Sequence, residues 1–219
     1  MRVALFFDGK NHMKDLRRAA SDRWIEHGTL AKWVVEHVGG TQMVSAWYYT
    51  GVPNPNDEAV GGDKHALADL LDDLERKPGF FVRRFNRRAN SRDCPHCRQL
   101  ITYTEEKMVD TSLVVDLVLL ASRDAFDIAV VFSGDSDIAP ALDALRGMGK
   151  QAWIATFGDA ALSRTLSRAA WHTIDLLPHI ESFAFPELEV AGARSVPAVP
   201  EQLDQEMKRE LPVPVARFD

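Results

Sequence analysis

The sequence predicts an α/β protein, a three-layer α/β/α sandwich built on a mostly parallel central sheet. Short apolar runs rich in β-branched residues, such as residues 128–132 (IAVVF), are too short for a typical helix. They are typical of strands buried on both faces of a parallel sheet. These runs alternate with segments of helical periodicity, and alternation at this spacing is typical of a doubly wound sheet.

The expected strands and helices follow one another along most of the chain. Strands are expected at residues 2–7, 43–50, 80–85, 128–132, 150–156 and 172–176. Helices are expected at residues 12–20, 29–38, 64–77, 110–121, 138–148 and 159–169. Asn11 and Thr29 are the expected N-caps of the first two helices, because short polar side chains accept hydrogen bonds from free backbone N–H groups. The helix at 110–121 is apolar nearly all round, which predicts that it is buried against the sheet.

The domain organisation follows from the points at which the alternation of strands and helices is interrupted. Residues 1–177 are expected to form one domain, interrupted at about 86–103 by an arginine-rich excursion that forms a loop or a hairpin. Residues 178–219 hold six of the eleven prolines and no core period. We therefore expect a proline-rich C-terminal tail, with a helix near 201–210.

Composition excludes several classes of protein. Hydrophobic residues make up 46% of the 219 residues and charged residues 26%, enough for a real core. No stretch is long and apolar enough to span a membrane, and the start of the chain is too short and too soon acidic for a signal peptide. Two cysteines, Cys94 and Cys97, make no disulfide framework. We expect a cytoplasmic protein with no membrane contact.

Acidic side chains follow the ends of two expected strands. Asp8 comes directly after the first strand, and Asp135 and Asp137 follow the strand at 128–132. The carboxyl ends of parallel strands meet at one edge of a sheet, and Asp110 joins them there if its helix starts at that edge. Two unit charges 4 Å apart repel by about 4 kcal/mol at an effective dielectric of 20. A hard divalent cation, Mg²⁺ or Mn²⁺, relieves this repulsion and suits carboxylate oxygens. Taken singly, Asp8, Asp110 and Asp137 also suit helix caps.

Asp116 is an acid that does not fit this set. It lies six residues after Asp110, about 120° away around an ideal helix. A half-buried aspartate needs a partner. The sequence leaves open whether Asp116 anchors the structure or supports the metal ligands.

Three ordered motifs also carry a family resemblance. The segments 6–11 (FFDGKN), 106–116 (EKMVDTSLVVD) and 132–140 (FSGDSDIAP) resemble the NYN domain in its LabA-like bacterial branch, which is similar to PIN-domain and 5′-nuclease folds. The resemblance implies a metal-dependent ribonuclease. It places the metal-binding acids at Asp8, Asp110, Asp135 and Asp137. Three further positions match its pattern: Asn11, Ser133 and Lys107. Lys10 departs from it, because a small residue is common there.

The function expected from these residues is hydrolysis of RNA phosphodiester bonds by a divalent-metal-dependent endoribonuclease. Asn11 and Ser133 would orient ligands or phosphate, and Lys107 would neutralise developing charge. The alternative is a non-catalytic RNA-binding or regulatory protein on a nuclease-like fold. A magnesium phosphatase of the haloacid type would need an aspartate where Lys10 stands.

The CPHC segment at 94–97 has the spacing of a metal-binding pair. Zinc needs four ligands and the chain has one cysteine pair, so Cys94 and Cys97 would need help from His96, His12 or His65. A homodimer in which each chain donates a pair is another solution. Two free thiols in a turn are as good an interpretation of the sequence as zinc.

Basic residues cluster around this segment inside an acidic protein of net charge −6. The expected nucleic-acid contacts are Arg83, Arg84, Arg87, Arg88, Arg92 and Arg98. Arginine pairs with phosphate and stacks on unpaired bases, which favours single-stranded RNA as the partner. The alternative is salt bridging to acids of the preceding helix, at Asp72, Asp73 or Glu75.

Overall fold

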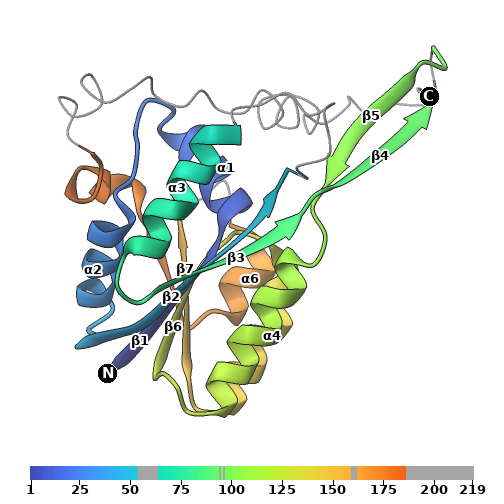
Figure 1. Ribbon diagram of the computed structural model, residues 1–219. Helices are drawn as coiled ribbons and strands as arrows, with labels where there is room; N and C mark the ends of the chain where they lie inside the picture. The colour runs from blue at the N-terminus through green and yellow to red at the C-terminus, as the bar shows by residue number, and fades with distance from the viewer. Residues whose placement is uncertain (54–63, 94, 96, 159–161, 186–219) are drawn as a thin grey trace, which may run out of the picture.

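The computed structural model describes residues 1–53, 64–93, 95, 97–158 and 162–185. Its centre is a six-stranded sheet in the order β3-β2-β1-β6-β7-β8 (Figure 1). The strands are β1 (Arg2–Asp8), β2 (Gln42–Val52), β3 (Phe80–Asn86), β6 (Ile128–Phe132), β7 (Gln151–Thr156) and β8 (His172–Asp175). All neighbouring strands of this sheet pair in parallel. The predicted fold class is therefore confirmed.

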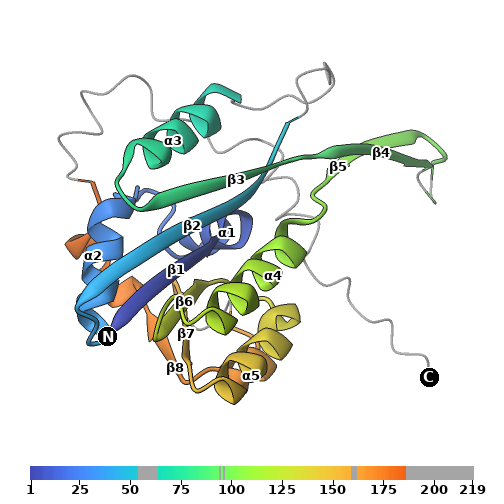
Figure 2. The same cartoon turned by 60° about the horizontal axis from the view of Figure 1, so that its bottom comes forward.

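Helices cover both faces of the sheet. On one face lie α1 (Gly9–Ala19), α2 (His27–His37) and α3 (Lys64–Arg76). On the other lie α4 (Val109–Ser122), α5 (Ala139–Gly147), which follows the short η1 (Ser136–Ile138), and α6 (Arg164–Ala169) (Figure 2). Strand β1 serves both layers, because alternate side chains point to opposite faces. Leu5 and Phe7 pack with the first set of helices, and Ala4 and Phe6 pack with the second.

The first two helices begin earlier than predicted, and both expected caps are wrong. Asp8, not Asn11, caps α1, and its carboxylate accepts a hydrogen bond from the Asn11 backbone N–H. Glu26, not Thr29, caps α2, and its carboxylate accepts from the backbone N–H groups of Gly28 and Thr29. In each case an acid placed before the expected cap satisfies the free N–H groups, so the helix starts there.

The excursion is a hairpin. Strands β4 (Arg88–Asp93) and β5 (Leu100–Glu105) pair antiparallel, with Arg88 opposite Glu105 and Asp93 opposite Leu100. We call this pair of strands the ribbon. It projects from the body of the protein as a two-stranded arm (Figures 1 and 2).

The folded domain continues past the predicted boundary at residue 177. The chain from 177 forms η3 (Leu177–Ser182), and Ile180 and Phe183 are buried in the core on the α2 side of the sheet. The Phe183 carbonyl accepts a hydrogen bond of 2.9 Å from the Glu26 backbone N–H. Residues 178–185 therefore belong to the folded domain and not to the expected tail, because two isolated apolar residues carry no detectable period. The helix expected near 201–210 and the start of the one expected at 159–169 lie outside the described residues.

Candidate active site

The acids lie at the topological switch point, where the order in which the chain adds strands to the sheet reverses. Strands β1 and β6 are neighbours at the centre; β2 and β3 extend the sheet on one side, and β7 and β8 on the other. In open α/β sheets this switch point opens a crevice beyond the carboxyl ends of the two central strands. Asp8 is the last residue of β1, and Ser133 follows the last residue of β6. We call this region the acid edge.

Asp8 is the innermost group of the acid edge, with only 1% of its surface exposed. Its Oδ2 atom accepts hydrogen bonds from the Asn11 side-chain amide at 2.5 Å and from the Ser133 hydroxyl at 3.0 Å. The next residue, Gly9, packs so closely that a β-carbon there would lie 2.6 Å from the ring of Tyr48. A glycine is therefore needed at this point for α1 to leave the sheet and for Asp8 to stay inside.

Burial sets the protonation of Asp8. Removal from water, together with the nearby charge of Asp110, raises the pKa of its carboxyl group to about 6. The hydrogen bonds from Asn11 and Ser133 act in the opposite sense, because they stabilise the charged form. The carboxylate is thus costly to keep ionised unless a cation approaches it.

The turn after β6 is held by a chain of hydrogen bonds. The Ser133 hydroxyl accepts from the backbone N–H of Asp135 at 3.2 Å. The Asp135 carboxylate in turn accepts from the backbone N–H of Asp137 at 3.0 Å and caps η1. Asp135 is half-buried and Asp137 is exposed. Ser133, Asp135 and Asp137 are therefore ordered relative to Asp8 through this chain of hydrogen bonds.

Asp110 lies in the first turn of α4 and takes part in the same electrostatic cluster. Burial raises the pKa of its carboxyl group, and the charges of Asp135, Glu106 and Asp137 raise it further, while Lys10 lowers it. The chain enters α4 through Met108, which has a left-handed φ of 73°. Bulky residues seldom adopt this conformation, and such strain occurs most often at functional sites.

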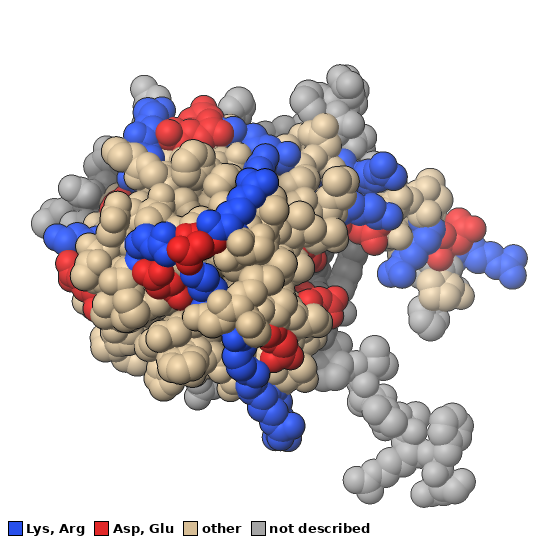
Figure 3. Space-filling view, turned by 90° about the horizontal axis from the view of Figure 1, so that it is seen from below, with Lys and Arg blue, Asp and Glu red and all other residues tan. Residues whose placement is uncertain are grey.

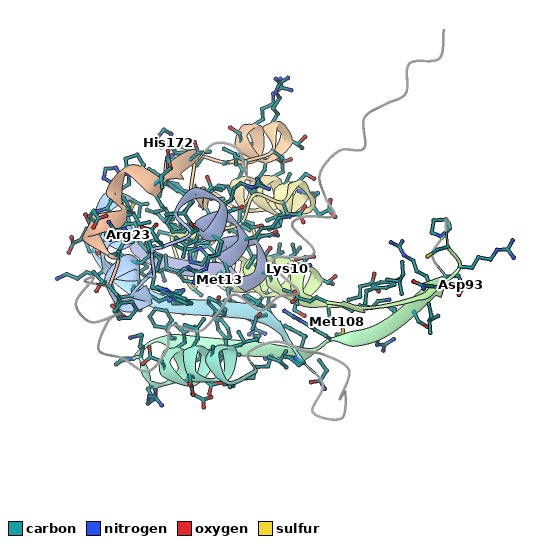
Figure 4. The ribbon with its side chains drawn as sticks, turned by 90° about the horizontal axis from the view of Figure 1, so that it is seen from above. Lys10, Met13, Arg23, Asp93, Met108 and His172 are labelled. Carbon is teal, nitrogen blue, oxygen red and sulfur yellow. The ribbon has the colours of Figure 1, made fainter. Side chains whose placement is uncertain are left out.

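Two charged residues of the acid edge were not predicted to belong to it. Glu106 raises the pKa of Asp110 and forms an ion pair with Arg87, with 2.7 Å between Oε1 and Nη2. Lys10, labelled at the start of α1 in Figure 4, lowers the pKa of Asp110. Glu106 is the first residue of the motif at 106–116, and its place in that motif is the signal that could have found it. Lys10 lies two residues after Asp8, and in the sequence it was recognised only as a departure from the family pattern.

The donor set suits a hard divalent ion held partly through water. Within the described ranges, no three His, Cys, Asp or Glu side chains form a group arranged to hold a metal ion directly. Asp8 Oδ1 accepts one hydrogen bond, which leaves a lone pair available. Mg²⁺ keeps several water ligands and is commonly bound through one or two carboxylates plus substrate phosphates. The residues present fit Mg²⁺ or Mn²⁺ in that mode.

The structure gives zinc no support at the cysteine pair. Cys97 is an exposed free thiol, and Cys94 and His96 lie outside the described residues. His12 is buried in the core, where its ring lies 5.3 Å from that of Phe7 and 5.4 Å from that of Phe157. It is therefore not placed to complete a site at the ribbon tip. The side chain of His65 is not among those described.

The six arginines expected to contact nucleic acid divide into two groups. Three of them pair with carboxylates: Arg83 with Asp116 at 3.5 Å, Arg84 with Asp72 at 2.9 Å and with Glu75, and Arg87 with Glu106. The alternative considered from the sequence, salt bridging to the preceding helix, is thus realised at Arg84. The other three are exposed and have no carboxylate partner among the described residues: Arg88 and Arg92 on the ribbon, and Arg98 between its two strands. Lys107 pairs with Glu105 at 3.3 Å at the base of the ribbon.

Asp116 has a structural partner. Its carboxylate accepts a hydrogen bond of 3.0 Å from the hydroxyl of Tyr49 and lies against Arg83. This answers the question that the sequence left open: Asp116 joins α4 to β2 and β3.

The fold and the site define a three-layer α/β/α domain that carries acids at the carboxyl ends of its central parallel strands. Residues 2–177 match the NYN domain, and the chain belongs to the NYN domain family, which is generally nuclease-like. The chain is 26% identical over 201 residues to the low amplitude and bright protein LabA of Synechococcus elongatus, a match that covers 90% of this chain and 97% of that protein. A crystal structure of a protein of unknown function from Vibrio parahaemolyticus has the same fold, with a TM-score of 0.55 and 17% identity over 84% of this chain and 96% of the other.

Proposed function

We propose that the protein is a divalent-metal-dependent endoribonuclease of the cytoplasm, which hydrolyses phosphodiester bonds of RNA. The observation that carries the proposal is the burial of Asp8 at the switch point. Its carboxylate accepts hydrogen bonds from Asn11 and Ser133, and the charge of Asp110 raises its pKa. The charges of Asp135 and Asp137 in turn raise the pKa of Asp110. A buried acid whose pKa is raised in this way is a signature of functional sites.

Each residue of the proposed active site is assigned one role. Asp8, Asp110, Asp135 and Asp137 are the proposed metal ligands. When bound, a divalent ion supplies a water of lowered pKa and stabilises charge on the leaving oxygen. Asn11 and Ser133 orient Asp8 through their hydrogen bonds. The half-exposed side chain of Lys107, which pairs with Glu105, is the proposed group that offsets charge on the substrate.

The test is cleavage of a circular single-stranded RNA by purified protein, because a circle without ends can be opened only by an endonuclease. Opening should require Mn²⁺ or Mg²⁺ and stop with chelator. Asp135→Asn should remove most of the activity yet leave the fold intact, since its amide oxygen can still accept from the Asp137 N–H. Asp143→Asn is a matched control, because Asp143 is exposed on α5 and pairs with Arg146.

The outcomes separate the candidate functions. Cleavage by Asp135→Asn at the wild-type rate with Mn²⁺ present would show that the acid edge is not the active site. Binding of the RNA without opening under any metal condition would instead favour the non-catalytic RNA-binding or regulatory protein.

A further inference from the structure

We propose that one face of the ribbon is a binding platform for single-stranded RNA that leads the strand to the acid edge. This inference rests on the proposed function, since it concerns how the substrate reaches the same site. The residues of the platform are Arg88 and Arg92 of β4 and Tyr103 of β5.

The register of the ribbon places these side chains together. Successive residues of a strand point to opposite faces, so Arg88, Asn90 and Arg92 share one face of β4. Tyr103 lies directly opposite Asn90, and directly opposed residues of an antiparallel pair share a face. The Arg92 guanidinium lies 5.6 Å from the centre of the Tyr103 ring. Two arginines therefore lie on either side of one tyrosine along this face, which also carries Glu105 and Ile101. Asp93 belongs to the opposite face.

The charges on this face are available to a ligand. Arg88 stands opposite Glu105, but the Glu105 carboxylate is engaged by the Asn90 amide at 3.0 Å and by Lys107 at 3.3 Å. Neither Arg88 nor Arg92 makes an ion pair within the part of the chain that the structure describes. In this they differ from Arg83, Arg84 and Arg87, whose guanidinium groups are paired with acids of the body.

The base of the ribbon is fixed beside the acid edge. Arg87 immediately precedes β4 and Glu106 immediately follows β5, and their ion pair closes the ribbon at the point where the chain turns into α4 and Asp110. Figure 4 labels Met108 at this base and Asp93 at the far end. In Figure 3 the ribbon projects from the body and shows basic side chains, with acidic ones beside them, along its length. A strand bound on the platform would run toward the acids.

The chemistry of the platform favours an unpaired strand. Bases stack on tyrosine and on arginine planes only when they are exposed, and arginine forks pair with phosphate. A two-stranded ribbon standing alone in water is at best marginally stable, so an occupant would also stabilise the ribbon. The acid edge repels a polyanion, and cations placed at the approach to it offset that repulsion.

The test measures binding rather than cleavage. Affinity of a fluorescent single-stranded RNA is measured by anisotropy in chelator, across a range of salt concentrations. Replacing Arg88 and Arg92 by alanine should weaken binding and reduce the slope of log affinity against log salt by about 0.7 for each phosphate that is no longer neutralised. Tyr103→Ala should weaken binding about 5-fold or more without changing the slope, whereas Tyr103→Phe should bind as wild type. Arg123→Ala, at the end of α4, removes one positive charge away from the ribbon and should change neither quantity.

The results distinguish this inference from the proposed function. Wild-type protein that does not bind single-stranded RNA in low salt, or ribbon variants with unaltered affinity and slope, would overturn the platform. Ribbon-dependent binding without metal-dependent cleavage would refute the nuclease alone. If the ribbon variants instead halve the molecular mass in solution and bind RNA normally, the ribbon is a dimerisation arm and the platform is wrong.

Discussion

Arg87 and Glu106 form an ion pair at the base of the ribbon with their side chains only 13% and 11% exposed. The Arg87 Nε also donates to Glu106 Oε1 at 3.0 Å, so two guanidinium nitrogens contact the same oxygen. Glu106 approaches β2 so closely that a β-carbon at Gly51 would lie 2.5 Å from its Cγ. The pair therefore joins the ribbon, the end of β2 and the segment that leads into α4.

Removing one partner of this pair should destabilise the fold. Arg87→Met leaves a carboxylate without its counter-ion in a poorly hydrated place, and we expect a loss of about 3 kcal/mol in the free energy of unfolding by urea. The double variant Arg87→Met, Glu106→Gln should recover most of that loss. Arg84→Met is the control, because its pairs with Asp72 and Glu75 lie at the surface and should be worth about 0–1 kcal/mol. Equal losses for Arg87→Met and Arg84→Met would contradict this account.

Charge repulsion at the acid edge predicts an effect on the metal-free protein. The charge of Asp135 raises the pKa of Asp110, so Asp135 makes the Asp110 carboxyl group harder to ionise. In chelator at pH 7, Asp135→Asn should be no less stable than wild type to urea. With excess Mg²⁺, wild type should gain stability and the variant should gain less. If the metal-free variant were clearly less stable than wild type, the Asp135 carboxylate would make net favourable contacts in the fold, and the repulsion account would be wrong.

The left-handed Met108 should cost stability. Its φ of 73° is unfavourable for a side chain with a β-carbon, and 67% of its surface is exposed, so truncation removes little packing. Met148 is also exposed but has a φ of −89°. Met108→Gly should therefore be more stable than Met148→Gly by about 1–2 kcal/mol, measured by chemical unfolding. Two variants of equal stability would show that Met108 is not strained.

The buried histidines should make the fold sensitive to acid. Burial lowers the pKa of His27 to about 4, although the charge of Glu26 opposes this, and burial also lowers the pKa of His12. Because the folded-state pKa is below the unfolded value of 6.5, stability is present above pH 6.5 and is lost as the pH falls toward 4. For His27 the loss between pH 7 and pH 5 is about 2 kcal/mol.

His27→Phe tests this origin, because a phenyl ring can keep the edge contacts with Phe7 and Tyr48. Its free energy of unfolding should fall less than that of wild type between pH 7 and pH 5. His172→Gln, at an exposed position on β8, should retain the wild-type dependence. A variant at His27 with the wild-type slope would assign the acid sensitivity to other groups.

Sequence pattern determined the architecture of this protein. Apolar runs and helical periods are local, so the alternation predicted the parallel sandwich, and the motifs around Asp8, Asp110 and Asp135 indicated the family, both of which are confirmed. The position of an acid at the end of a strand is also local. The acids were therefore expected at one edge before any distance was known.

Only the tertiary structure decided which partner each charged group takes. Arg87 and Glu106 are brought together by the register of β4 with β5, and Arg83, Asp116 and Tyr49 by the stacking of α4 on the sheet. The first residues of α1 and α2 depended on which acid, Asp8 or Glu26, could reach the free backbone N–H groups. The burial of Phe183 depended on contact with residues far away in the chain, such as Trp33 of α2. Pairing and burial arise from contacts between segments far apart in the chain. Neither the composition nor the local periodicity of the sequence records such contacts.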